Sequence, residues 1–555
     1  MALNKESFKL LKSRFQKKLD NMDQEWRGLW LDISNFIAPM HGRFLEKRDS
    51  QAAKGGDKTK NIINGTATRA IKIAAAGMKG GLTPHSLPWF KLSLRDKDLA
   101  KWEPARIWLL ETQALMYNAF SRSNFYHAIH NVYSEELLFA TGPIFIGEDP
   151  IKTIHCKPWT AGEYVVSVDE KGEVDAAFRW FFMSVSALAK KFGYERLSQN
   201  AKGLLQKNPD HHIQIIHAIF KRSDRDHQML DNLNFEWGSC YWEYKGNSET
   251  WLGESGYNSD PLMFPRWDLV SEDAYGSSCP GMEMIGDVKM LQKLERDKLQ
   301  ALHKVLDPPM LNPVKMLGRL STLPGAQNNV STADAAGVKP LYQINPDINS
   351  VRQEIRDVEQ RIKEICYNDL FLMILESHTM TATEVAQRHE DKLAILGPVI
   401  ERQNSELLSP IIDRVYDIMA RQQLIPPPPE ELIDMELDVE YVSLLAQAQK
   451  MVGTQSIEKQ LGLVASVAEL NPEIIDTIDF DEVSEQYADM NGTPPKIIRS
   501  REERKKIRDQ RAQAQAAMAQ QEQAAQLADT GQKLGKIRTD EPNVAANILG
   551  QMVQQ

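Results

Sequence analysis

The side chains that could do chemistry in this sequence lack the spacing that catalysis or metal binding needs. A metal site needs several ligands at fixed spacing, as in the string HExxH. His212 lies in a strand-like alternation, where a structural histidine is the simpler interpretation. The acid pairs Asp169/Glu170 and Asp224/Asp226 fall in turn-like segments, where solvated carboxylates are expected. The other candidates by residue type are His155, Cys156, His211, His217 and His378.

Residues 55–59, Gly-Gly-Asp-Lys-Thr, resemble a phosphate-binding loop only superficially. A P-loop needs GxxxxGK[ST] directly after a buried strand, and here no glycine stands at that distance and no apolar strand leads in. A mobile, solvated loop is therefore the preferred interpretation of residues 41–60. The sequence also lacks a nucleophile elbow and a dinucleotide fingerprint. We expect no catalysis by this chain, no bound metal and no cofactor.

Composition and charge narrow the class of protein further. The length of 555 residues suggests roughly three to four domain-sized units. A net charge of −10 argues against a protein that coats nucleic acid, since such affinity comes chiefly from lysine and arginine. Four scattered cysteines predict reduced thiols in a cytosol-like compartment. No signal-peptide core and no apolar run of roughly 18 residues occurs, so we expect neither export by that route nor a membrane anchor.

Residues 345–424 organise the rest of the chain. In the first part, residues 345–375, apolar residues recur at steps of three and four and form one stripe on a helix. A polar break follows at residues 376–380, after which Thr381 can cap the next helix while Glu384 reaches back to a free backbone donor. That second helix continues to about Leu424, and Gly397-Pro398 and Pro410 should kink it. The stripe of the first helix comprises Ile348, Val351, Ile355, Val358, Ile362 and Ile365.

The stripe needs a partner helix, and residues 280–306 supply it. Between the two helices lie residues 307–344, which begin with Asp307-Pro308-Pro309 and are rich in Gly, Pro, Asn and Thr. That length is uncommon for a structureless loop and indicates a small module. We therefore expect two paired helices with a module at their tip. The apolar residues of the partner helix are Ile285, Val288, Leu291, Leu294, Leu302, Val305 and Leu306.

Residues 1–279 combine helices with strands. The period of the apolar residues predicts helices at residues 4–38, 61–81, 104–120 and 124–139, and the small residues of the second of these permit close packing. From Gly142 the period changes to two. Two short helices, at residues 186–194 and 195–206, interrupt the strands, and the grouping indicates an α+β body. The predicted strands are 143–147, 151–157, 163–168, 174–183, 212–221, 235–244 and 249–252.

The C-terminal part is divided by charge. Pro426 to Pro429 form a stiff stop, and residues 426–490 hold fifteen acidic residues against two lysines. Helices are expected there at residues 442–452, 456–470 and 472–478. Residues 496–511 then carry eight basic residues against three acidic ones and continue into an Ala/Gln tract with strong helix propensity. This basic helix is the best nucleic-acid candidate by charge, and a solvated face with internal ion pairs is the alternative of equal weight.

Several short strings, in this order and spacing, resemble the portal (head-to-tail connector) proteins of short-tailed, podovirus-type tailed bacteriophages. The resemblance covers residues 1–429, and the tail beyond them matches only in being helical and charged. The strings are Glu25-Trp26, Ile37-Ala38-Pro39, Gly42-Arg43-Phe44, Pro88-Trp89-Phe90-Lys91-Leu92, Asp307-Pro308-Pro309-Met310, Met380-Thr381-Ala382-Thr383-Glu384-Val385 and Leu396-Gly397-Pro398-Val399.

The resemblance implies a mainly helical α+β portal fold and a ring, usually of twelve copies, at one capsid vertex of the virion. Double-stranded DNA would enter and leave through its channel without sequence specificity. The implied domains are a wing at 1–279, stem helices at 280–306 and 345–375, a clip at 307–344 and a tunnel loop at 376–381. These are followed by a long kinked helix at 382–429 and a crown at 430–495. A basic and Ala/Gln-rich helix at 496–528 could extend the crown as a barrel, and the chain would end in a flexible tail at 529–555.

The resemblance also assigns roles to residues and names partners. The partners would be the terminase large subunit, tail adaptor and tail tube proteins, major capsid and scaffolding proteins, and internal core proteins, with assembly in the host bacterial cytoplasm. The DNA-facing residues would be Glu376, Ser377, His378, Thr379 and Met380. The stem residues that pack between subunits would be Ile285, Val288, Leu291, Ile348, Val351, Ile355, Val358 and Ile362. The clip would dock its partners through Pro308, Pro309, Met310, Gly318 and Arg319, and the basic helix would present Arg501, Arg504, Lys505 and Arg508.

Two other classes of protein stay open on the residues alone. The heptads could form a simple coiled-coil dimer in a scaffolding or interaction protein that makes no ring. A less favoured alternative is an enzyme whose site is assembled in the α+β body, with His212 or Asp224 as the side chains to test. One physical argument favours the hypothesis of a ring. The acidic and basic stretches of one chain can meet across the heterologous interfaces of a closed ring.

Overall fold

The structure is a computed structural model that describes residues 3–46, 59–96, 99, 102–223, 225–226, 228–229, 231–244, 251–271, 273–306, 310–311, 339–340, 347–376, 390–433, 435, 437–445, 447, 464, 466, 477–483, 503–518 and 521. The chain divides into two compact units, Met1–Leu463 and Val464–Gln555. The first unit combines helices with antiparallel sheets, so the α+β class predicted from the sequence is confirmed.

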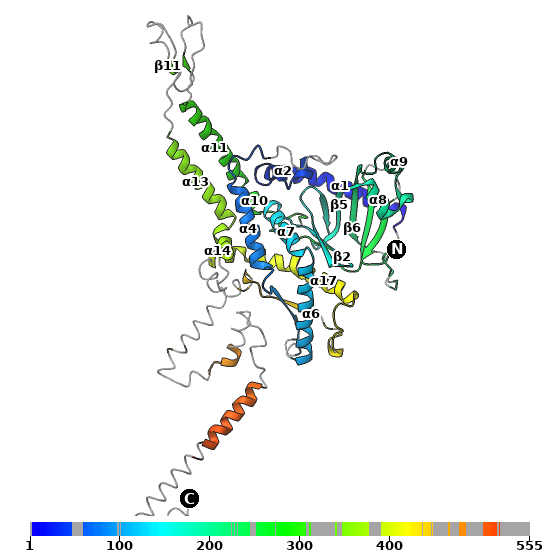
Figure 1. Ribbon diagram of the computed structural model, residues 1–555, viewed down its shortest axis with the longest axis vertical. Coiled ribbons are helices and arrows are strands. Elements are labelled where there is room, and N and C mark those ends of the chain that lie inside the picture. Colours follow the sequence, from blue (N-terminus) through cyan, green and yellow to red (C-terminus); the bar gives the residue numbers. More distant parts are fainter. Residues whose placement is uncertain are drawn as a thin grey trace, which may run out of the picture. The chain divides into compact units, whose positions relative to one another are not determined.

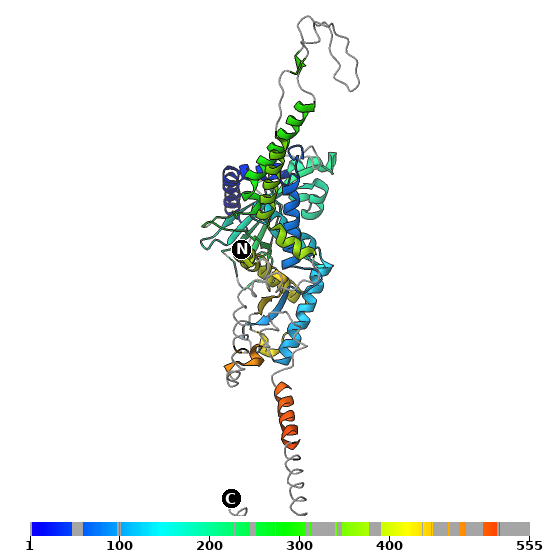
Figure 2. The same cartoon turned by 90° about the vertical axis from the view of Figure 1, so that its left-hand side faces the viewer.

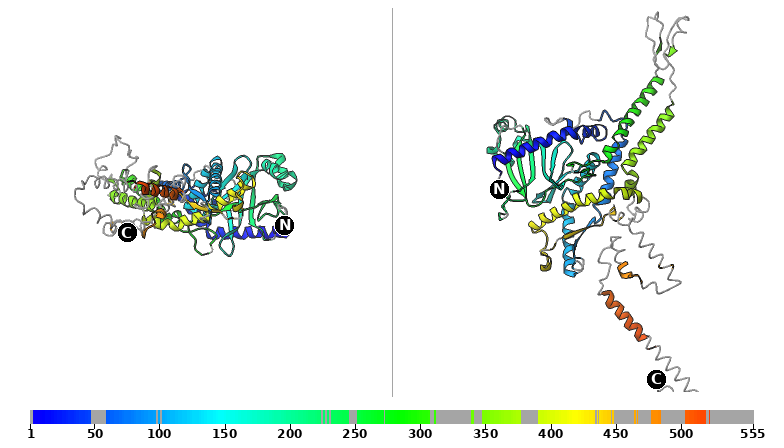
Figure 3. Two further views of the ribbon diagram at one scale, coloured as in Figure 1. Left: turned by 90° about the horizontal axis from the view of Figure 1, so that it is seen from below. Right: turned by 180° about the vertical axis from the view of Figure 1, so that it is seen from behind.

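Five antiparallel strands form the larger sheet, in the order β4-β5-β6-β7-β8. Neighbouring residues of a strand face opposite sides, and Phe178 and Trp180 of β5 share one side. Helix α1 (Lys5–Glu25) lies across that side (Figures 1 and 3), and its Phe15 ring lies 5.6 and 6.1 Å from theirs. The strands are β4 (Tyr164–Val168), β5 (Val174–Ser184), β6 (His212–Lys221), β7 (Trp237–Glu243) and β8 (Gly253–Tyr257).

A second, three-stranded sheet faces the other side of the larger one. Its order is β3-β2-β9, from β2 (Ile144–Asp149), β3 (Thr153–Pro158) and β9 (Leu262–Met263). Phe145 of β2 pairs with Lys157 of β3, so both side chains point to the same side. The Phe145 ring lies 6.3 Å from His217 of β6 and 5.7 Å from Tyr257 of β8. The two sheets therefore meet through an aromatic layer.

Most of the strands predicted from the sequence are confirmed to within two residues at each end, because runs rich in β-branched and aromatic residues mark them. Of the strand predicted at residues 249–252, residues 249 and 250 lie outside the described residues, and residues 251 and 252 precede the strand β8, which begins at Gly253. Its sequence, Gly-Glu-Ser-Gly-Tyr, carries no apolar alternation, and it is held by pairing with β7, with Ser255 opposite Ser239. The two short helices interrupting the strands are α8 (Val185–Phe192) and α9 (Gln199–Lys207), with a 3-10 turn at Tyr194–Arg196 between them.

The first helix predicted from the sequence, residues 4–38, is divided at Trp26 into α1 and α2 (Arg27–Phe36). Asn4 caps α1, since its side-chain oxygen accepts a hydrogen bond from the Ser7 amide at 2.7 Å. At the division, the Trp26 ring lies 5.9 Å from Trp30 and 5.7 Å from Tyr275. Burial of this aromatic cluster favours a turn over a continuous rod. A short helix, α3 (Arg43–Glu46), follows.

Helix α4 (Thr66–Leu82) lies at the centre of the helical layer and contacts α7 (Phe125–Phe139), α13 and α14. Small residues let these neighbours approach closely, as its composition predicts. A Cβ added at Gly77 would lie 2.4 Å from the Phe371 side chain, and one at Gly81 would lie 2.4 Å from Leu445. The remaining helix of this layer is α6 (Glu103–Arg122).

A two-stranded sheet joins residues that are far apart in the sequence. Strand β1 (Phe90–Leu94) pairs antiparallel with β12 (Leu437–Tyr441), with Phe90 opposite Tyr441. The backbone amide of Val442 also donates to the carbonyl of Trp89 at 3.1 Å. The sequence indicated an extended segment around Phe90 but no strand at 437–441, where the stretch of acidic residues hid the alternation. A 3-10 turn at Glu430–Leu432 precedes β12.

Two long helices run antiparallel beside each other (Figures 1 and 2). The first is α11 (Ile285–Leu306), preceded by the single turn α10 (Pro280–Glu283), and the second is α13 (Ile348–Ile365). The helix predicted over residues 345–375 is interrupted at Tyr367, whose φ of 52° is left-handed, before α14 (Asn368–Glu376). This turn lets α14 pack on α4. Between α11 and α13, the short strands β10 (Met310–Leu311) and β11 (Lys339–Pro340) pair antiparallel.

The helix expected after the polar break is described from Glu390 onward. It consists of α16 (Glu390–Arg402), a π-helical segment (Gln403–Leu408) and α17 (Ser409–Arg421). Pro398 lies inside α16, whereas Pro410 stands in the first turn of α17, directly after the π segment. A proline clashes with the carbonyl four residues earlier, and a wider π turn relieves that clash. The irregularity predicted for this helix is thus localised at residues 403–408.

The second unit is described at residues 464, 466, 477–483, 503–518 and 521. Residues 503–518 form a helix, within the segment predicted to be helical at residues 496–528. The helices predicted at residues 442–452, 456–470 and 472–478 fall largely outside the described residues.

Replacing Gly77 with alanine should destabilise the first unit, since the added Cβ would meet the Phe371 ring at 2.4 Å. We expect a loss of about 1–3 kcal/mol in the free energy of unfolding, measured by chemical denaturation. The matched control is Gly203→Ala in α9, where nothing lies within 4 Å of the added Cβ. That change should stabilise by roughly 0.5–1 kcal/mol. Equal effects of the two substitutions would show that α14 does not approach α4 this closely.

Candidate functional site

The seam between α11 and α13 is filled within one chain. Val288 and Leu291 of α11 and Ile355, Val358 and Ile362 of α13 are buried, whereas Ile285, Ile348 and Val351 are half-buried. The structure thus brings all eight residues of the predicted stem set onto two paired helices. Five of them are already covered by their own chain, so any further packing partner would meet the outer faces of the two helices. On α11 these faces expose Met290, Leu299, Val305 and Leu306.

Polar contacts fix the register of the two helices. Arg361 of α13 donates to Asp287 of α11 at 3.3 Å. At the start of α13, Asp347 accepts hydrogen bonds from the amides of Asn349 and Ser350, at 3.0 and 3.2 Å. The hydroxyl and amide of Ser350 are the main causes of a lowered pKa for the Asp347 carboxyl. This cap also suits the positive end of the helix dipole, so α13 begins at a defined residue.

Both helices are clamped to the start of α4 by amide side chains. Gln292, which is buried in α11, accepts from the amides of Ile63 and Asn64 at 2.7 and 2.9 Å and donates to the Asn64 carbonyl at 2.8 Å. The Asn64 side chain donates to Glu295 of α11 at 3.2 Å and to Glu359 of α13 at 2.8 Å. Asn64 therefore ties the start of α4 to both α11 and α13. The backbone amides of Ile63 and Asn64, which precede α4, also gain a hydrogen-bond partner in Gln292.

The predicted tunnel loop lies mostly outside the described residues. Glu376 is the last residue of α14, and Ser377, His378, Thr379, Met380, Thr381 and Glu384 are not described. The segments on either side are fixed, however. Phe371 of α14 packs over Gly77 of α4, and Asp369 of α14 forms an ion pair with Lys392 of α16. The start of α14 is thus joined to the start of α16.

The remaining residues of the predicted sites are only partly covered. In the clip set, Met310 lies in β10, while Pro308, Pro309, Gly318 and Arg319 lie outside the described residues. In the basic set, Arg501 is not described and Lys505 is exposed on the helix 503–518. Arg508 donates to both oxygens of Asp481 at 2.6 and 2.7 Å, and Arg504 lies 3.5 Å from the same carboxylate. Part of the basic face is thus neutralised within the second unit.

A buried acid and a buried amide join α7 to the π-helical segment. The Gln403 amide donates to Oε1 of Glu136, and both residues are fully buried. Oε2 of Glu136 and Oε1 of Gln403 have no hydrogen-bond partner among the described residues. If Glu136 is protonated, its O–H can donate to the Gln403 oxygen, and a cyclic acid–amide pair satisfies both atoms. The geometry is therefore that of a neutral carboxylic acid.

The electrostatics of Glu136 agree with a neutral acid. Burial raises its pKa well above the ordinary 4.5, and the Glu406 carboxylate raises it further, while the hydrogen bond from Gln403 lowers it. Glu406 is itself held by Arg266, whose Nη2 lies 2.9 Å from Oε1 and whose backbone amide donates to Oε2 at 3.0 Å. The π segment therefore holds both Gln403 and Glu406 against the body.

Helix α17 is tied to both sheets by buried arginine. Arg414 is 1% exposed and donates to the hydroxyl of Ser259 at 2.7 Å and its carbonyl at 3.2 Å. Ser259 in turn donates to Asp417 at 2.6 Å, and Arg421 bridges Asp417 to Glu148 of β2, at 3.0 and 2.8 Å. The Arg414 guanidinium also lies over Tyr257 of β8, at 5.7 Å. These contacts attach the long helix to the α+β body.

Sequence reasoning missed these buried polar pairs. A signal was present in α7, where Glu135 and Glu136 stand in an otherwise apolar run, since carboxyl groups inside such a run need partners. The partner of Glu135 is His41, 2.6 Å away, and that contact outweighs burial and raises the pKa of His41. Nothing in the sequence pointed to Gln403 as the partner of Glu136, or to the pairing of Asn64 with Gln292, Glu295 and Glu359. Long-range amide contacts carry no local pattern.

The candidates for chemistry lie apart in the structure. His212 is exposed at the start of β6, His217 is buried beside Ser239, and Cys156 is buried with the other cysteines. Asp224 is outside the described residues. Over the described residues, no group of three metal-liganding side chains occurs. A search of the same residues finds no helix with the length and apolar character of a membrane span.

A helical pair clamped to an α+β body agrees with the class that the sequence resembled. Residues 9–498 match the family of bacteriophage head to tail connecting proteins, and the chain belongs to this family.

Two curated relatives match nearly the whole chain. The probable portal protein of Bordetella phage BPP-1 is 36% identical over 545 residues, covering 97% of each chain. The portal protein of Salmonella phage epsilon15 is 35% identical over 548 residues, covering 97% of this chain and 98% of the relative. A chain of the solved virion of a native gene transfer agent particle covers 73% of this chain at 10% identity, with a TM-score of 0.30, a likeness that adds nothing to the family assignment.

Replacing Glu136 with glutamine should remove a pH dependence of stability. The pKa of Glu136 is raised in the folded protein, so protonation of this carboxyl stabilises the fold. This contribution to the free energy of unfolding is fully present below pH 4.5 and is lost as the pH rises toward the pKa of the folded state. Glutamine keeps the two-point pair with Gln403 at every pH. Between pH 5 and 8 the wild type should lose about 1.4 kcal/mol per pH unit relative to the variant, up to that pKa.

The measurement is urea unfolding of both proteins at each pH. The control Glu111→Gln changes an exposed acid of α6 and should follow the wild type. A wild-type and Glu136→Gln pair whose stabilities change in parallel with pH would mean that Glu136 is ionised in the folded protein.

Proposed function

We propose that this chain is a portal protein, which forms a ring at one capsid vertex of a phage particle and passes double-stranded DNA during packaging and ejection. The observation that carries the proposal is identity of 35–36% to two portal proteins over 97% of the chain. The family match over residues 9–498 supports the same role. A match over this length leaves no large part of the chain for an unrelated activity.

The elements of the first unit receive portal roles in this proposal. Residues 1–279 form the wing, α11 and α13 with α14 form the stem, and residues 307–344 form the clip that docks the terminase motor and later the tail adaptor. Support comes from the clamp at Asn64, which holds both stem helices to α4. A stem that transmits load between clip and wing needs such an attachment, because paired helices alone could slide.

The segment around residues 376–381 is proposed as the tunnel loop, where Glu376, Ser377, His378, Thr379 and Met380 meet passing DNA. Its support is the ion pair between Asp369 and Lys392, which brings the two flanking helices together. Thr381 and Glu384 would cap the helix that follows. The long helix to residue 429 then returns to the wing through its π segment.

Residues 430–495 are proposed as the crown and residues 496–528 as a helical extension of it. The support is the helix at residues 503–518 and the return of the chain through β12, which pairs with β1 in the first unit. The chain would carry no catalytic step and no cofactor, and hydrolysis of ATP would belong to the motor. Its other partners would be capsid, scaffolding, tail and internal core proteins within the virion.

Purified protein should form rings that are visible by negative-stain electron microscopy. We expect top views with one central channel and a sedimentation coefficient that corresponds to about twelve subunits of 63.0 kDa, the number usual in the family. Mass photometry gives the subunit number independently. Dimers that stay rod-shaped at every protein concentration would favour a coiled-coil scaffold and refute the portal assignment.

Removal of residues 310–344 tests the clip. The deletion starts after α11 ends at Leu306 and stops before α13 begins at Ile348, so the clamped helices are untouched. Rings should persist, while binding of the terminase large subunit or tail adaptor in pull-down should fall to background. The control is removal of residues 529–555, which should leave binding unchanged. Full binding by the clip deletion would place the docking site elsewhere.

A further inference from the structure

A cluster of cations surrounds an aromatic floor where the two sheets meet. Arg179 of β5 lies over the rings of Trp159 and Phe181, at 5.6 and 5.2 Å. Lys157 of β3 lies over the same Phe181 ring at 5.3 Å, and Lys191 of α8 lies over Tyr241 at 4.2 Å. We name Lys157, Arg179 and Lys191 the cation cluster.

The cluster has an excess of positive charge. Glu163 pairs with Arg179 at 3.1 Å, and both residues are buried. Neither Lys157 nor Lys191 has an ion pair with another described residue, and both side chains are exposed. His217, buried and stacked on Tyr241 at 4.0 Å, adds no charge, because burial and then the three cations hold its pKa well below 6.5.

Positive charges act on one another at Lys157. Partial burial of the Lys157 side chain is the main reason why its pKa is lowered to about 8. The positive charges of Arg179 and Lys191 lower this pKa as well, and the Glu163 carboxylate opposes them. Cation–π contacts compensate only part of such repulsion. A carboxylate placed between the two lysines would remove it, so the surface fits an acidic partner.

The same chain carries an acidic surface of matching character. Residues 430–440 hold six acidic residues, and no lysine or arginine occurs from Gln422 to Gln449. Of these acids, Glu430, Glu431 and Asp438 are exposed. Two large apolar side chains are exposed among them, Ile433 at 63% and Met435 at 43%. Acids that flank exposed apolar side chains are typical of an interface that a partner covers.

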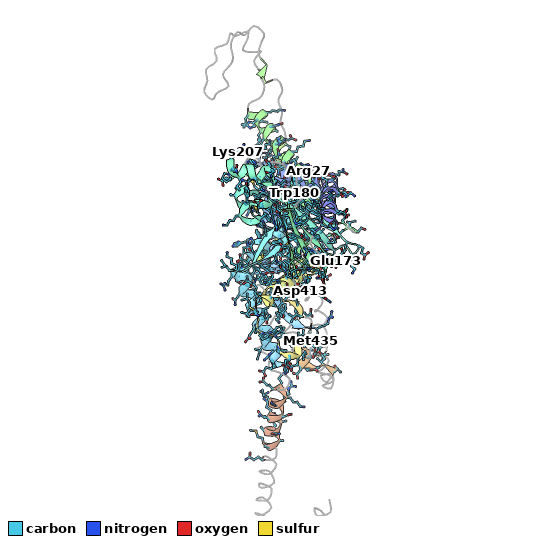
Figure 4. All side chains as sticks on the ribbon, turned by 90° about the vertical axis from the view of Figure 1, so that its right-hand side faces the viewer. Arg27, Glu173, Trp180, Lys207, Asp413 and Met435 are labelled. Atoms are coloured by element: carbon cyan, nitrogen blue, oxygen red, sulfur yellow. The ribbon has the colours of Figure 1, made fainter. Side chains whose placement is uncertain are left out.

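The two surfaces lie on different parts of the first unit. Lys207, in the helix α9 beside α8, and Met435 are far apart in Figure 4. One chain therefore leaves both its cation cluster and its acidic surface uncovered. In a closed ring, each subunit presents two different surfaces to its two neighbours, so both can be satisfied in every copy.

We infer that the cation cluster of one copy binds the acidic segment 430–440 of the neighbouring copy. In this contact Lys157 and Lys191 form ion pairs with Glu430 and Glu431. This contact rests on the proposed function, since it requires a ring. Nucleic acid is the competing ligand for lysines, but the net charge of −10 and the aromatic floor favour a carboxylate and apolar partner.

Charge reversal tests the contact. The variant Lys157→Glu with Lys191→Glu should raise the protein concentration for half-maximal ring assembly about tenfold, measured by mass photometry, since close charge pairs contribute strongly at interfaces. The matched control, Lys152→Glu with Lys190→Glu, makes the same charge change at exposed lysines of the β2–β3 turn and of α8 and should assemble as wild type. Adding Glu430→Lys and Glu431→Lys to the first variant should restore assembly.

Cross-linking locates the contact directly. The four native cysteines are buried, so Lys191→Cys with Glu431→Cys introduces the exposed thiols. Oxidation of assembled rings should give a ladder of covalent multimers, whereas Lys190→Cys with Glu170→Cys should give none. If circular dichroism shows that the reversal variant is unfolded, the milder variant Lys157→Gln with Lys191→Gln and this cross-link still test the contact.

The outcomes separate the contact from the portal role. Rings that form normally in the reversal variant and do not cross-link would overturn the contact and leave the portal role intact. Normal rings combined with lost binding of a 30-base-pair duplex, measured by fluorescence anisotropy, would assign the cluster to DNA and also overturn the contact. A wild-type protein that makes no rings would refute the portal role, and the contact with it.

Discussion

The close approach of other segments to helix α4 is the constraint on which the rest of the first unit depends. Gly77 admits Phe371 of α14, and Gly81 admits Leu445, which follows β12. At the start of the same helix, Asn64 joins α11 and α13. The paired helices α11 and α13, the helix α14 and the strand β12 are thus all positioned by one helix. A side chain at either glycine would move elements that lie more than 280 residues further along the chain.

Buried polar pairs supply the specificity that close packing alone lacks. Apolar faces can slide past one another, whereas Glu136 with Gln403, and Arg266 with Glu406, are satisfied only in one register. A buried ion pair gives little net stability, because desolvation offsets much of the attraction, but a misplaced one is costly. The π segment at residues 403–408 carries both Gln403 and Glu406, which are the two partners on the long helix. The long helix is therefore held at a defined position on the body.

The sequence allowed the α+β class, most strands and the helix pair to be predicted, because each has its own period of apolar residues. The breaks at Trp26 and Tyr367 could not be predicted, since they arise where distant aromatic or helical surfaces meet. The eight residues predicted for the stem lie on two paired helices, and their burial within one chain depends on how the helices turn toward each other. For the candidate site, Glu136 was visible as an acid in an apolar run, while Gln403 and Gln292 were not, as an amide fits any surface helix.

The pairing of β1 with β12 has a consequence for folding during synthesis. Phe90 meets Tyr441 only after 351 further residues have been made, since the two are opposite each other in the sheet. At about 5–20 residues per second, this takes roughly 20–70 s. For that time the nascent chain keeps an unpaired strand edge, which invites pairing with other chains. Lys91 and Ser93 on β1 interrupt the apolar residues of this edge, and a host chaperone that covers it would raise the yield of assembly-competent subunits.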